Sequence, residues 1–297
     1  MRTCPNCRHG ERVVKKGFYQ RPSDGKRIQR YLCRCCSKQF SDQIRSIDYR
    51  HRKRSINHMA FLMLCKGVSQ RGAAFMLNVK PETIARRVVR FGQVAEAHLA
   101  AYRASRPQAT AVMFDEMESF EHTKCKPLTI PIAVEAKTRK ILALKVGQIA
   151  AKGPLAAISR KKYGPRPCER SACLDRVLTD IQSCVAPDAM ITTDRSHHYP
   201  AKVKHFFPEA QHATVRGRRG CVVGQGELKR GGFDPLFSLN HTYAMIRDNI
   251  KRLTRRTWCT TKRRDRLELL IYLYAYFHNE RLEKGRRVTL RRAPIPI

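Results

Sequence analysis

Hydrophobic and polar positions divide the chain into segments of different character. Residues 1–45 contain little aliphatic sequence, residues 46–105 have a helical pattern, and residues 106–285 mix strand-like and helical stretches. The final stretch, residues 286–297, contains two prolines, which disfavour a helix. We therefore expect three domains over the first three ranges and a flexible tail over the fourth.

The middle segment is expected to form three helices. Pro81 suits the first turn of the third helix, where its missing N–H group is not needed. Ile84, Val88 and Phe91 then recur at the spacing of one buried helical face. The Asn-Val pair at 78–79, between two short helices, is typical of the turn in a helix-turn-helix motif.

The third helix is expected to turn four polar side chains outward: Thr83, Arg86, Arg87 and Arg90. Side chains of these types contact base edges and phosphates in the major groove of DNA. A three-helix connector without DNA contacts is the alternative interpretation of the same pattern.

The large segment has the strand and helix order of a mixed sheet. We expect a strand over Thr110–Phe114, with Asp115 at or near its end, and a later strand, AMITTD, that ends in Asp194. Between them, LTIPIAVEAKT and KILALKVGQI predict two strands and roughly residues 169–185 a helix. A short helix over 200–207 and a strand at QHATV follow. Three antiparallel strands, a helix, a strand and further helix is the order of a ribonuclease-H-like core.

The stretch SLNHTYAMIRDNIKRLTRRT, residues 238–257, is predicted to form a basic amphipathic helix. Its apolar stripe comprises Leu239, Tyr243, Ile246, Ile250 and Leu253. A second stripe, about 100° round, carries Asn240, Arg247 and Lys251. Asp248 is expected on the side opposite the apolar stripe. A helix that edges a core and aims an amide and two cations the same way indicates a site.

The charge balance then narrows the class of partner. The chain has 60 Lys and Arg against 24 Asp and Glu, a formal net charge of +36, spread along its length. Such a surplus favours a polyanion, with nucleic acid first and an anionic membrane second. The apolar run Leu267–Phe277 is far shorter than the roughly 20 residues of a membrane span, and no apolar signal segment follows MRTCPNC. We expect a cytoplasmic, nucleoid-associated protein that binds double-stranded DNA and no membrane.

Five of the twelve cysteines lie in the first segment, in two closely spaced groups. The pairs Cys4 and Cys7, and Cys33 and Cys36, each have Cys-x-x-Cys spacing, which suits one tetrahedral Zn²⁺. Strands from RVVKKGFYQ and RIQRYLC, joined by a long turn at PSDGK, would form the intervening hairpin. We expect a zinc ribbon, with Cys35 as the spare thiol; a cluster of free cysteines is the alternative.

Asp115 and Asp194 are the candidate catalytic acids. Each ends an apolar strand, and two such carboxylates with a third oxygen ligand hold two Mg²⁺ or Mn²⁺ ions for in-line phosphoryl displacement. An aspartate at a strand end is, by itself, more often a turn residue. Asn240 borders the apolar stripe of its helix and offers a carbonyl oxygen, so it is the candidate third ligand.

Several of these stretches resemble bacterial insertion-sequence transposases of the "insertion sequence one" type, within the DDE superfamily. The similar stretches are CPNC with RYLCRCCSKQFS, VSQRGAAFMLNVKPETIARRV, DEMESF, TTDRSHHYP with FFPEAQH, and NIKRLTRRTWCTT. The resemblance implies an α+β multidomain chain: zinc ribbon, helix-turn-helix and ribonuclease-H-like catalytic domain. It also implies an enzyme that binds terminal inverted repeats, cleaves them with a divalent metal and joins the 3′ hydroxyl to target DNA, as a homo-oligomer on DNA.

The sequence departs from this family at the third acid, where Asn240 stands in place of a catalytic glutamate. Related transposases have Asp-Asp-Asn sites, so the change does not by itself imply an inactive protein. His212 matches a family histidine. Lys251 and Arg255 are expected to track DNA on the same helix face as Asn240.

Other side chains near these motifs have open roles, and two other functions remain possible. Glu116, Glu118, His198 and His241 could assist or could be ordinary surface and core residues. The first alternative function is a non-catalytic DNA-binding regulator derived from a transposase. The second is a junction-specific nuclease on the same core.

Overall fold

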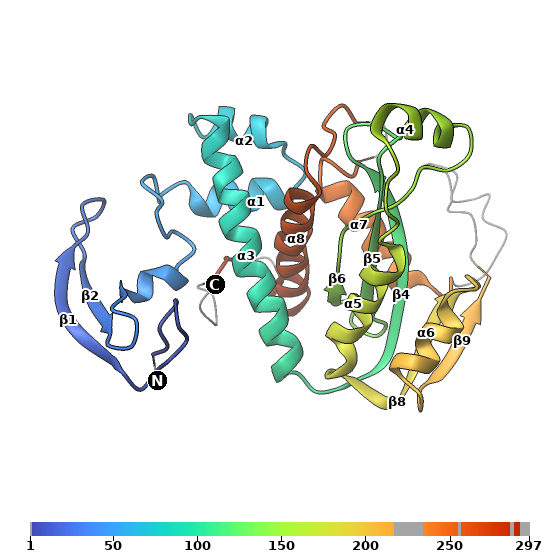
Figure 1. Cartoon of the computed structure of the whole chain (residues 1–297), viewed down its shortest axis with the longest axis horizontal. Coiled ribbons are helices and arrows are strands. Elements are labelled where there is room, and N and C mark those ends of the chain that lie inside the picture. Colours follow the sequence, from blue (N-terminus) through green and yellow to red (C-terminus); the bar gives the residue numbers. More distant parts are fainter. Residues whose placement is uncertain (1, 217–233, 255–256, 286–287, 292–297) are drawn as a thin grey trace.

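A computed structural model describes residues 2–216, 234–254, 257–285 and 288–291, and Figure 1 shows the arrangement of their elements. A small β-ribbon lies at one side of the molecule, a group of helices lies in the middle, and a mixed sheet with its covering helices lies at the other side (Figure 1). The chain passes through these parts in that order, but α8, near the C-terminus, returns to the middle.

The ribbon is a small antiparallel sheet in the order β1-β2-β3. Its strands are β1 (Val13–Gln20), β2 (Arg27–Cys33) and β3 (Gln39–Phe40), followed by a short 3-10 helix at Asp42–Arg45. The expected hairpin with a long turn is therefore present.

Three helices follow, as the middle segment predicted. They are α1 (Asn57–Cys65), α2 (Gln70–Met76) and α3 (Pro81–Ser105). The Ser69 hydroxyl accepts a hydrogen bond from the Gly72 N–H at 3.0 Å, which satisfies a free donor at the start of α2. Asn78 adopts a φ of 47° in the turn before α3, a conformation that asparagine tolerates better than most residues.

The large sheet has the order β6-β5-β4-β8-β9, with β7 paired to β5. Strands β4, β8 and β9 run parallel, whereas β5 is antiparallel to both β4 and β6. The strands are β4 (Ala109–Phe120), β5 (Pro127–Glu135), β6 (Ile141–Leu144), β7 (Gly147–Gln148), β8 (Val185–Asp194) and β9 (Gln211–Val215). The helices of this part are α4 (Leu155–Tyr163), α5 (Arg170–Gln182), α6 (Tyr199–Phe206), α7 (Phe237–Asn249) and α8 (Arg264–Lys284).

Alternate residues of β4 point into two different hydrophobic cores. Phe114 packs with residues of α5 and α6 on one face, and Met117 packs with residues of α3, α7 and α8 on the other. Helix α3 lies along α8, and a Cβ atom on Gly92 would come within 2.6 Å of the Leu269 carbonyl oxygen. The predicted helix-turn-helix segment thus shares one core with the large segment rather than enclosing a separate one.

Two expected element boundaries are wrong. Strand β4 continues through Phe120, so Asp115 lies in its middle, because residues 115–120 pair with β5 in unbroken register. Helix α7 ends at Asn249 rather than near residue 257. The Gly67 N–H donates to the Asn249 carbonyl at 2.9 Å, and that contact from a distant segment satisfies a carbonyl that a longer helix would use.

The described part of the expected flexible tail is packed. Val288 and Leu290 are buried in the core beside α8, and the Tyr276 hydroxyl donates to the Thr289 carbonyl at 2.9 Å. Apolar burial therefore fixes a segment that its prolines and arginines had marked as loose. Among the described residues, no helix is long and apolar enough to cross a membrane.

Candidate functional site

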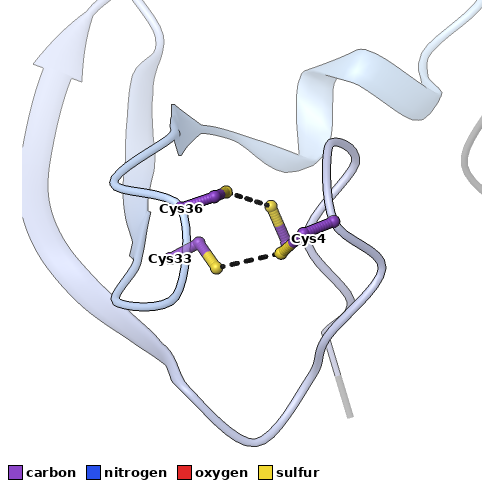
Figure 2. Close-up of side chains that lie close together, drawn as sticks. Cys4, Cys33 and Cys36 are labelled. Carbon is purple, nitrogen blue, oxygen red and sulfur yellow. Dashed lines mark hydrogen bonds between the residues drawn. The ribbon is translucent and has the colours of Figure 1, made fainter.

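The ribbon brings its four predicted zinc ligands together. The thiol sulfurs of Cys4, Cys7, Cys33 and Cys36 lie within 4.8 Å of one another. The Cys4–Cys36 sulfur distance is 3.6 Å and the Cys7–Cys33 distance is 3.5 Å (Figure 2). A tetrahedral zinc site with Zn–S bonds near 2.3 Å has sulfurs about 3.8 Å apart, so the cluster has the size that a zinc ion requires. Cys35 is exposed, as expected for the spare thiol.

Local hydrogen bonds lower the pKa of two of the four thiols in the cluster. The Asn6 side chain and the Lys38 backbone lower the pKa of the Cys36 thiol to about 6. Backbone N–H groups of the Cys33–Cys36 knuckle lower the pKa of Cys33. The pKa of Cys7 is raised to about 12, because burial and the other three thiols outweigh the lowering by a backbone hydrogen bond at His9. The four thiols therefore cannot all ionise together unless a cation compensates their charge.

The sheet brings the two predicted acids to equivalent positions on its parallel central strands. Val112 pairs with Ile191 and Met113 pairs with Thr192. Two residues further along, the same register places Asp115 beside Asp194. Residues that lie opposite each other in a sheet point to the same face, and neighbouring strands lie about 4.8 Å apart. The two carboxylates therefore share the face that α7 covers.

Two tyrosines enclose Asp115. The Tyr199 hydroxyl, on α6, donates to the Asp115 carboxylate at 2.9 Å. The Tyr243 hydroxyl, on α7, donates to the Asp115 backbone carbonyl. Tyr199 packs edge-on against Phe114 with ring centroids 5.1 Å apart, which fixes its position. Sequence analysis assigned no role to the Tyr199 hydroxyl, although the Tyr that follows TTD was part of the resemblance.

Burial is the main cause that raises the pKa of Asp115. The negative charge of Asp194 adds to the rise, whereas the Glu116 N–H, the Tyr199 hydroxyl and Arg170 oppose it. The Asp194 carboxylate accepts a hydrogen bond from the Ser196 N–H at 2.8 Å. Two neighbouring, half-buried carboxylates are stabilised in ionised form by a bound cation, so this arrangement favours a divalent metal.

The third predicted ligand, Asn240, is exposed near the start of α7. Its amide donates to the Asp234 carboxylate at 2.8 Å, and Asp234 also accepts from the Leu236 N–H at 3.0 Å. Asn240 and Tyr243 are three residues apart on α7, so their side chains are neighbours on the helix surface. Tyr243 reaches Asp115, and Asn240 is its neighbour about one turn closer to the start of α7. Asp248 is exposed, as expected.

Among the residues that the structure describes, only the four cysteines form a group of three or more His, Cys, Asp or Glu ligands within 4.8 Å. Within the described ranges, Asp115 and Asp194 thus have no third ligand of these types at such a distance. Asn240 is the oxygen ligand that sequence analysis proposed, and its contact with Asp234 is a feature that sequence analysis missed. The signal for Asp234 was its place three residues before a helix, where aspartate usually binds local backbone N–H groups.

Glu116 and Glu118 lie on the opposite face of β4 from Asp115. Both form ion pairs with Arg170 of α5, and Glu118 also contacts Lys152 at 3.4 Å. Burial raises the pKa of Glu116 despite the Arg170 charge. These two glutamates tie α5 to the sheet and do not join the acid pair.

The histidines lie around the acid pair without entering it. His212 is within 2.9 Å of the Thr193 hydroxyl, and burial lowers its pKa. His198 is exposed and stacks near His197, with ring centroids 3.7 Å apart. His241 packs near Phe237, and burial, with the charge of Arg139, lowers its pKa.

The predicted DNA-contacting face of α3 is only partly exposed. Arg86 is exposed and Thr83 is half-buried. The expectation that Arg87 points outward is wrong, because Arg87 is buried and donates to the Lys53 carbonyl at 2.8 Å. Arg90 is half-buried and donates to the Ser46 carbonyl at 2.8 Å.

These two arginines donate hydrogen bonds to backbone carbonyl groups of the segment that leads from the ribbon into the helices. Their guanidinium groups thereby satisfy carbonyl oxygens of this segment. Lys251 is exposed but follows the end of α7, so it does not share a helical face with Asn240. Arg255 lies outside the described residues.

Comparisons with known proteins add little to this geometry. No protein-family model matches the chain, and no curated protein matches it significantly. Among solved structures, a similar chain occurs in the "Crystal structure of a pre-cleavage Mos1 transpososome". That similarity has a TM-score of 0.24 at 10% sequence identity and covers 78% of each chain. A similarity at this level does not show a shared family.

Proposed function

We propose that this chain is a metal-dependent DNA transposase of the DDE type, with asparagine in place of the third acid. The observation that supports this most is the placement of Asp115 and Asp194 side by side on central parallel strands. The strand order β6-β5-β4-β8-β9 is the order of a ribonuclease-H-like core, with β4 at its centre. The net charge of +36 suits a DNA substrate.

In this proposal, Asp115, Asp194 and Asn240 hold divalent metal ions, either Mg²⁺ or Mn²⁺. The ions supply the activation of the attacking oxygen and the stabilisation of the leaving oxygen during phosphoryl transfer. Tyr199 keeps the Asp115 carboxylate in position through its hydrogen bond. Asn240 is neutral, so the site carries less negative charge than three carboxylates would, and we expect a higher metal requirement than in an all-acid site.

The ribbon is proposed to bind one structural Zn²⁺ through Cys4, Cys7, Cys33 and Cys36. The size of the sulfur cluster supports this assignment. Helices α2 and α3 are proposed to bind double-stranded DNA, with Arg86 in the major groove and Thr83 beside it. Arg87 and Arg90 are assigned to holding the preceding loop rather than DNA.

A strand-transfer assay tests the catalytic proposal. The substrate is labelled linear DNA that carries the sequences flanking the coding region, incubated with a supercoiled target and either Mg²⁺ or Mn²⁺. We expect nicking at the flanks and covalent joining of the labelled 3′ end to the target. Nicking without joining would favour a junction nuclease. DNA binding without nicking or joining would contradict the proposal that the chain is a transposase.

One observation favours a second candidate, a non-catalytic DNA-binding protein on the same core. The Asn240 amide is held by Asp234 rather than by the strand carboxylates. If this contact replaces metal binding, the wild-type protein is inactive. Restoration of nicking by Asn240→Glu would then identify a chain that lost its activity through this one position.

A further inference from the structure

Trp258 is the single tryptophan of the chain, and its side chain is fully exposed at 101% of the reference area. Tryptophan is among the residues that gain most from burial, since its side chain can bury 150–250 Å². A single exposed aromatic side chain does not mark a site, because scattered apolar residues are normal on protein surfaces. Two further features of this region do point to a ligand.

The first feature is that the backbone around Trp258 is held in place. The Thr260 N–H donates to the Trp258 carbonyl at 3.0 Å, and Thr261 is fully buried. Thr261 forms a bridge with Glu121, and its carbonyl accepts from the His122 N–H at 2.8 Å. The indole is therefore presented to solvent from a segment anchored on the turn between β4 and β5. A segment held in this way loses less backbone entropy when the indole binds a ligand.

The second feature is the charge of the surroundings. We define the turn surface as the β4–β5 turn (residues 121–126), helix α4 (Leu155–Tyr163) and residues 257–263. Helix α4 is attached to this turn because the Ser159 hydroxyl donates to the Cys125 carbonyl at 2.7 Å. Lys126 lies over the Tyr163 ring, 4.5 Å from its centroid.

Exposed cations are frequent on the turn surface: Lys124, Arg160, Lys161, Lys162, Lys262 and Arg263. Asp265, just outside, is paired with Arg263 at 2.8 Å and offsets that charge, and Glu121 is half-buried, so the other five cations are in excess. An exposed aromatic ring among cations is the combination that binds single-stranded nucleic acid, where cations follow phosphates and rings stack on bases.

The turn surface is connected to the acid pair by β4 itself. Glu121 is six residues beyond Asp115, and a rise of 3.3 Å per residue gives a separation of about 20 Å. A strand of DNA that passes the acid pair can reach the turn surface within several nucleotides. In duplex DNA the bases are stacked on one another, so an indole can stack on a base only where the strands are separated.

From these features we propose that Trp258 stacks on an unpaired DNA base, and that the turn surface binds a separated strand next to the cleavage site. This inference rests on the proposed function, because it assumes that the substrate is DNA. It assigns to the chain a binding site for single-stranded DNA that is separate from the helix-turn-helix contact with duplex DNA.

The test uses intrinsic fluorescence, because Trp258 is the single tryptophan and reports on itself alone. The full-length protein is titrated at low ionic strength with a single-stranded oligothymidylate or a blunt duplex of equal length. Both carry a terminal fluorescein, so that anisotropy measures binding in parallel. We expect strong quenching of the indole emission by the single strand and little quenching by the duplex, with an anisotropy increase for both.

Three variants separate stacking from simple apolar contact. Trp258→Phe keeps an aromatic face, Trp258→Leu keeps apolar area without a ring, and Trp258→Ala keeps neither. We expect single-strand affinity to fall roughly 5- to 100-fold in the Ala and Leu variants and much less in the Phe variant. Duplex affinity should be nearly unchanged in all three variants.

The outcomes that contradict the inference differ from those that contradict the proposed function. Bound single strand without quenching, equal quenching by the duplex, or wild-type affinity in Trp258→Leu would each overturn stacking and leave DNA binding intact. Concentration-dependent self-association that Trp258→Ala abolishes would instead assign the indole to a contact with a second copy. No anisotropy change with either DNA would contradict the proposed function itself.

Discussion

The four-cysteine cluster and the pair of aspartates are both candidate metal sites, yet the chain assembles them in opposite ways. The cysteines come from two tight knuckles joined by one hairpin, and their sulfurs lie within 4.8 Å of one another. Asp115 and Asp194 are almost eighty residues apart, and only the parallel pairing of β4 with β8 brings them together. A site built from local turns can be identified from spacing, whereas a site built by a sheet depends on the whole topology.

The largest expected effect concerns the local site. Cys33→Ser should abolish zinc binding and unfold the ribbon, because thiolate coordination and folding of so small a unit are one event. Structural zinc contributes roughly 10–16 kcal/mol in comparable peptides. Metal analysis should fall from one zinc per chain to none, and proteolysis should cut residues 2–45 while sparing the large sheet.

Cys35→Ser is the matched control for this variant, since Cys35 lies in the same knuckle but is exposed. It should keep a full zinc content. If wild-type protein purified without chelator contains no zinc, the four cysteines are not a zinc site and the prediction is wrong.

The next largest effect concerns the acid pair. Asp115→Asn and Asp194→Asn should each reduce strand cleavage by about 10³-fold or more, since loss of a metal ligand removes several kcal/mol of transition-state stabilisation. DNA affinity should stay the same or rise slightly, because each change removes one negative charge. Cleavage rates and anisotropy titrations measure the two effects separately.

Asp188→Asn provides the control, because Asp188 is an exposed acid on the same strand, six residues before Asp194. It lies in the part of β8 where the pairing with β4 is irregular, away from the acid pair. Equal loss of cleavage in this variant would mean that β8 contributes general negative charge rather than a specific ligand.

A smaller effect is expected at Asn240. Asn240→Ala should reduce cleavage by about 10- to 100-fold, because water can partly replace a neutral oxygen ligand. Asn240→Asp should retain more activity and need less Mg²⁺. Asp248→Ala should change little, because this side chain lies about 140° round α7 from Tyr243, which contacts Asp115. The reverse order, with Asp248→Ala inactive and Asn240→Ala active, would move the third ligand to Asp248.

The smallest effect concerns the segment that joins the ribbon to the helices, where His51 is buried beside Asn57. Burial first, and then the charge of Arg87, lowers the pKa of His51 to about 4. The folded state therefore favours neutral His51. The stability that neutral His51 contributes to the folded state is fully present above pH 6.5 and is lost as the pH falls toward 4. At pH 5, His51 is protonated in the unfolded state but not in the folded state, which lowers the free energy of unfolding by about 2 kcal/mol.

Thermal unfolding at pH 7 and pH 5 measures this term. His51→Gln should show a smaller loss of Tm between the two values than the wild-type chain. His58→Gln, at an exposed position of α1, should behave as the wild-type chain does. An identical pH response in all three proteins would show that His51 is accessible to water in the folded state.

The sequence predicted which helices and strands form better than it predicted where they end and which residues they contact. Apolar runs and the Cys-x-x-Cys spacing were enough to place the ribbon hairpin and the main strands of the large sheet. The end of α7 was not predictable, because it depends on a hydrogen bond from Gly67, nearly two hundred residues earlier. The burial of Arg87 was missed for a similar reason, since its partner is a carbonyl of a preceding loop.

The candidate acids were found in the right strands, but their environment was not. Alternation within β4 shows that Asp115 and Glu116 face opposite sides, yet it cannot show that Arg170 binds the second of them. The Tyr199 and Asp234 contacts likewise required the packing of α6 and the start of α7.

Under the proposed DNA-binding function, the close packing of α3 on α8 limits how the chain can acquire a new DNA target. Gly92 leaves no room for a side chain against Leu269, so a foreign recognition helix would have to match this surface atom by atom. Exchange of residues 46–105 for those of a relative should therefore produce insoluble chimeras. New specificity is more readily reached by single changes at exposed positions such as Arg86, which leave the shared interior untouched.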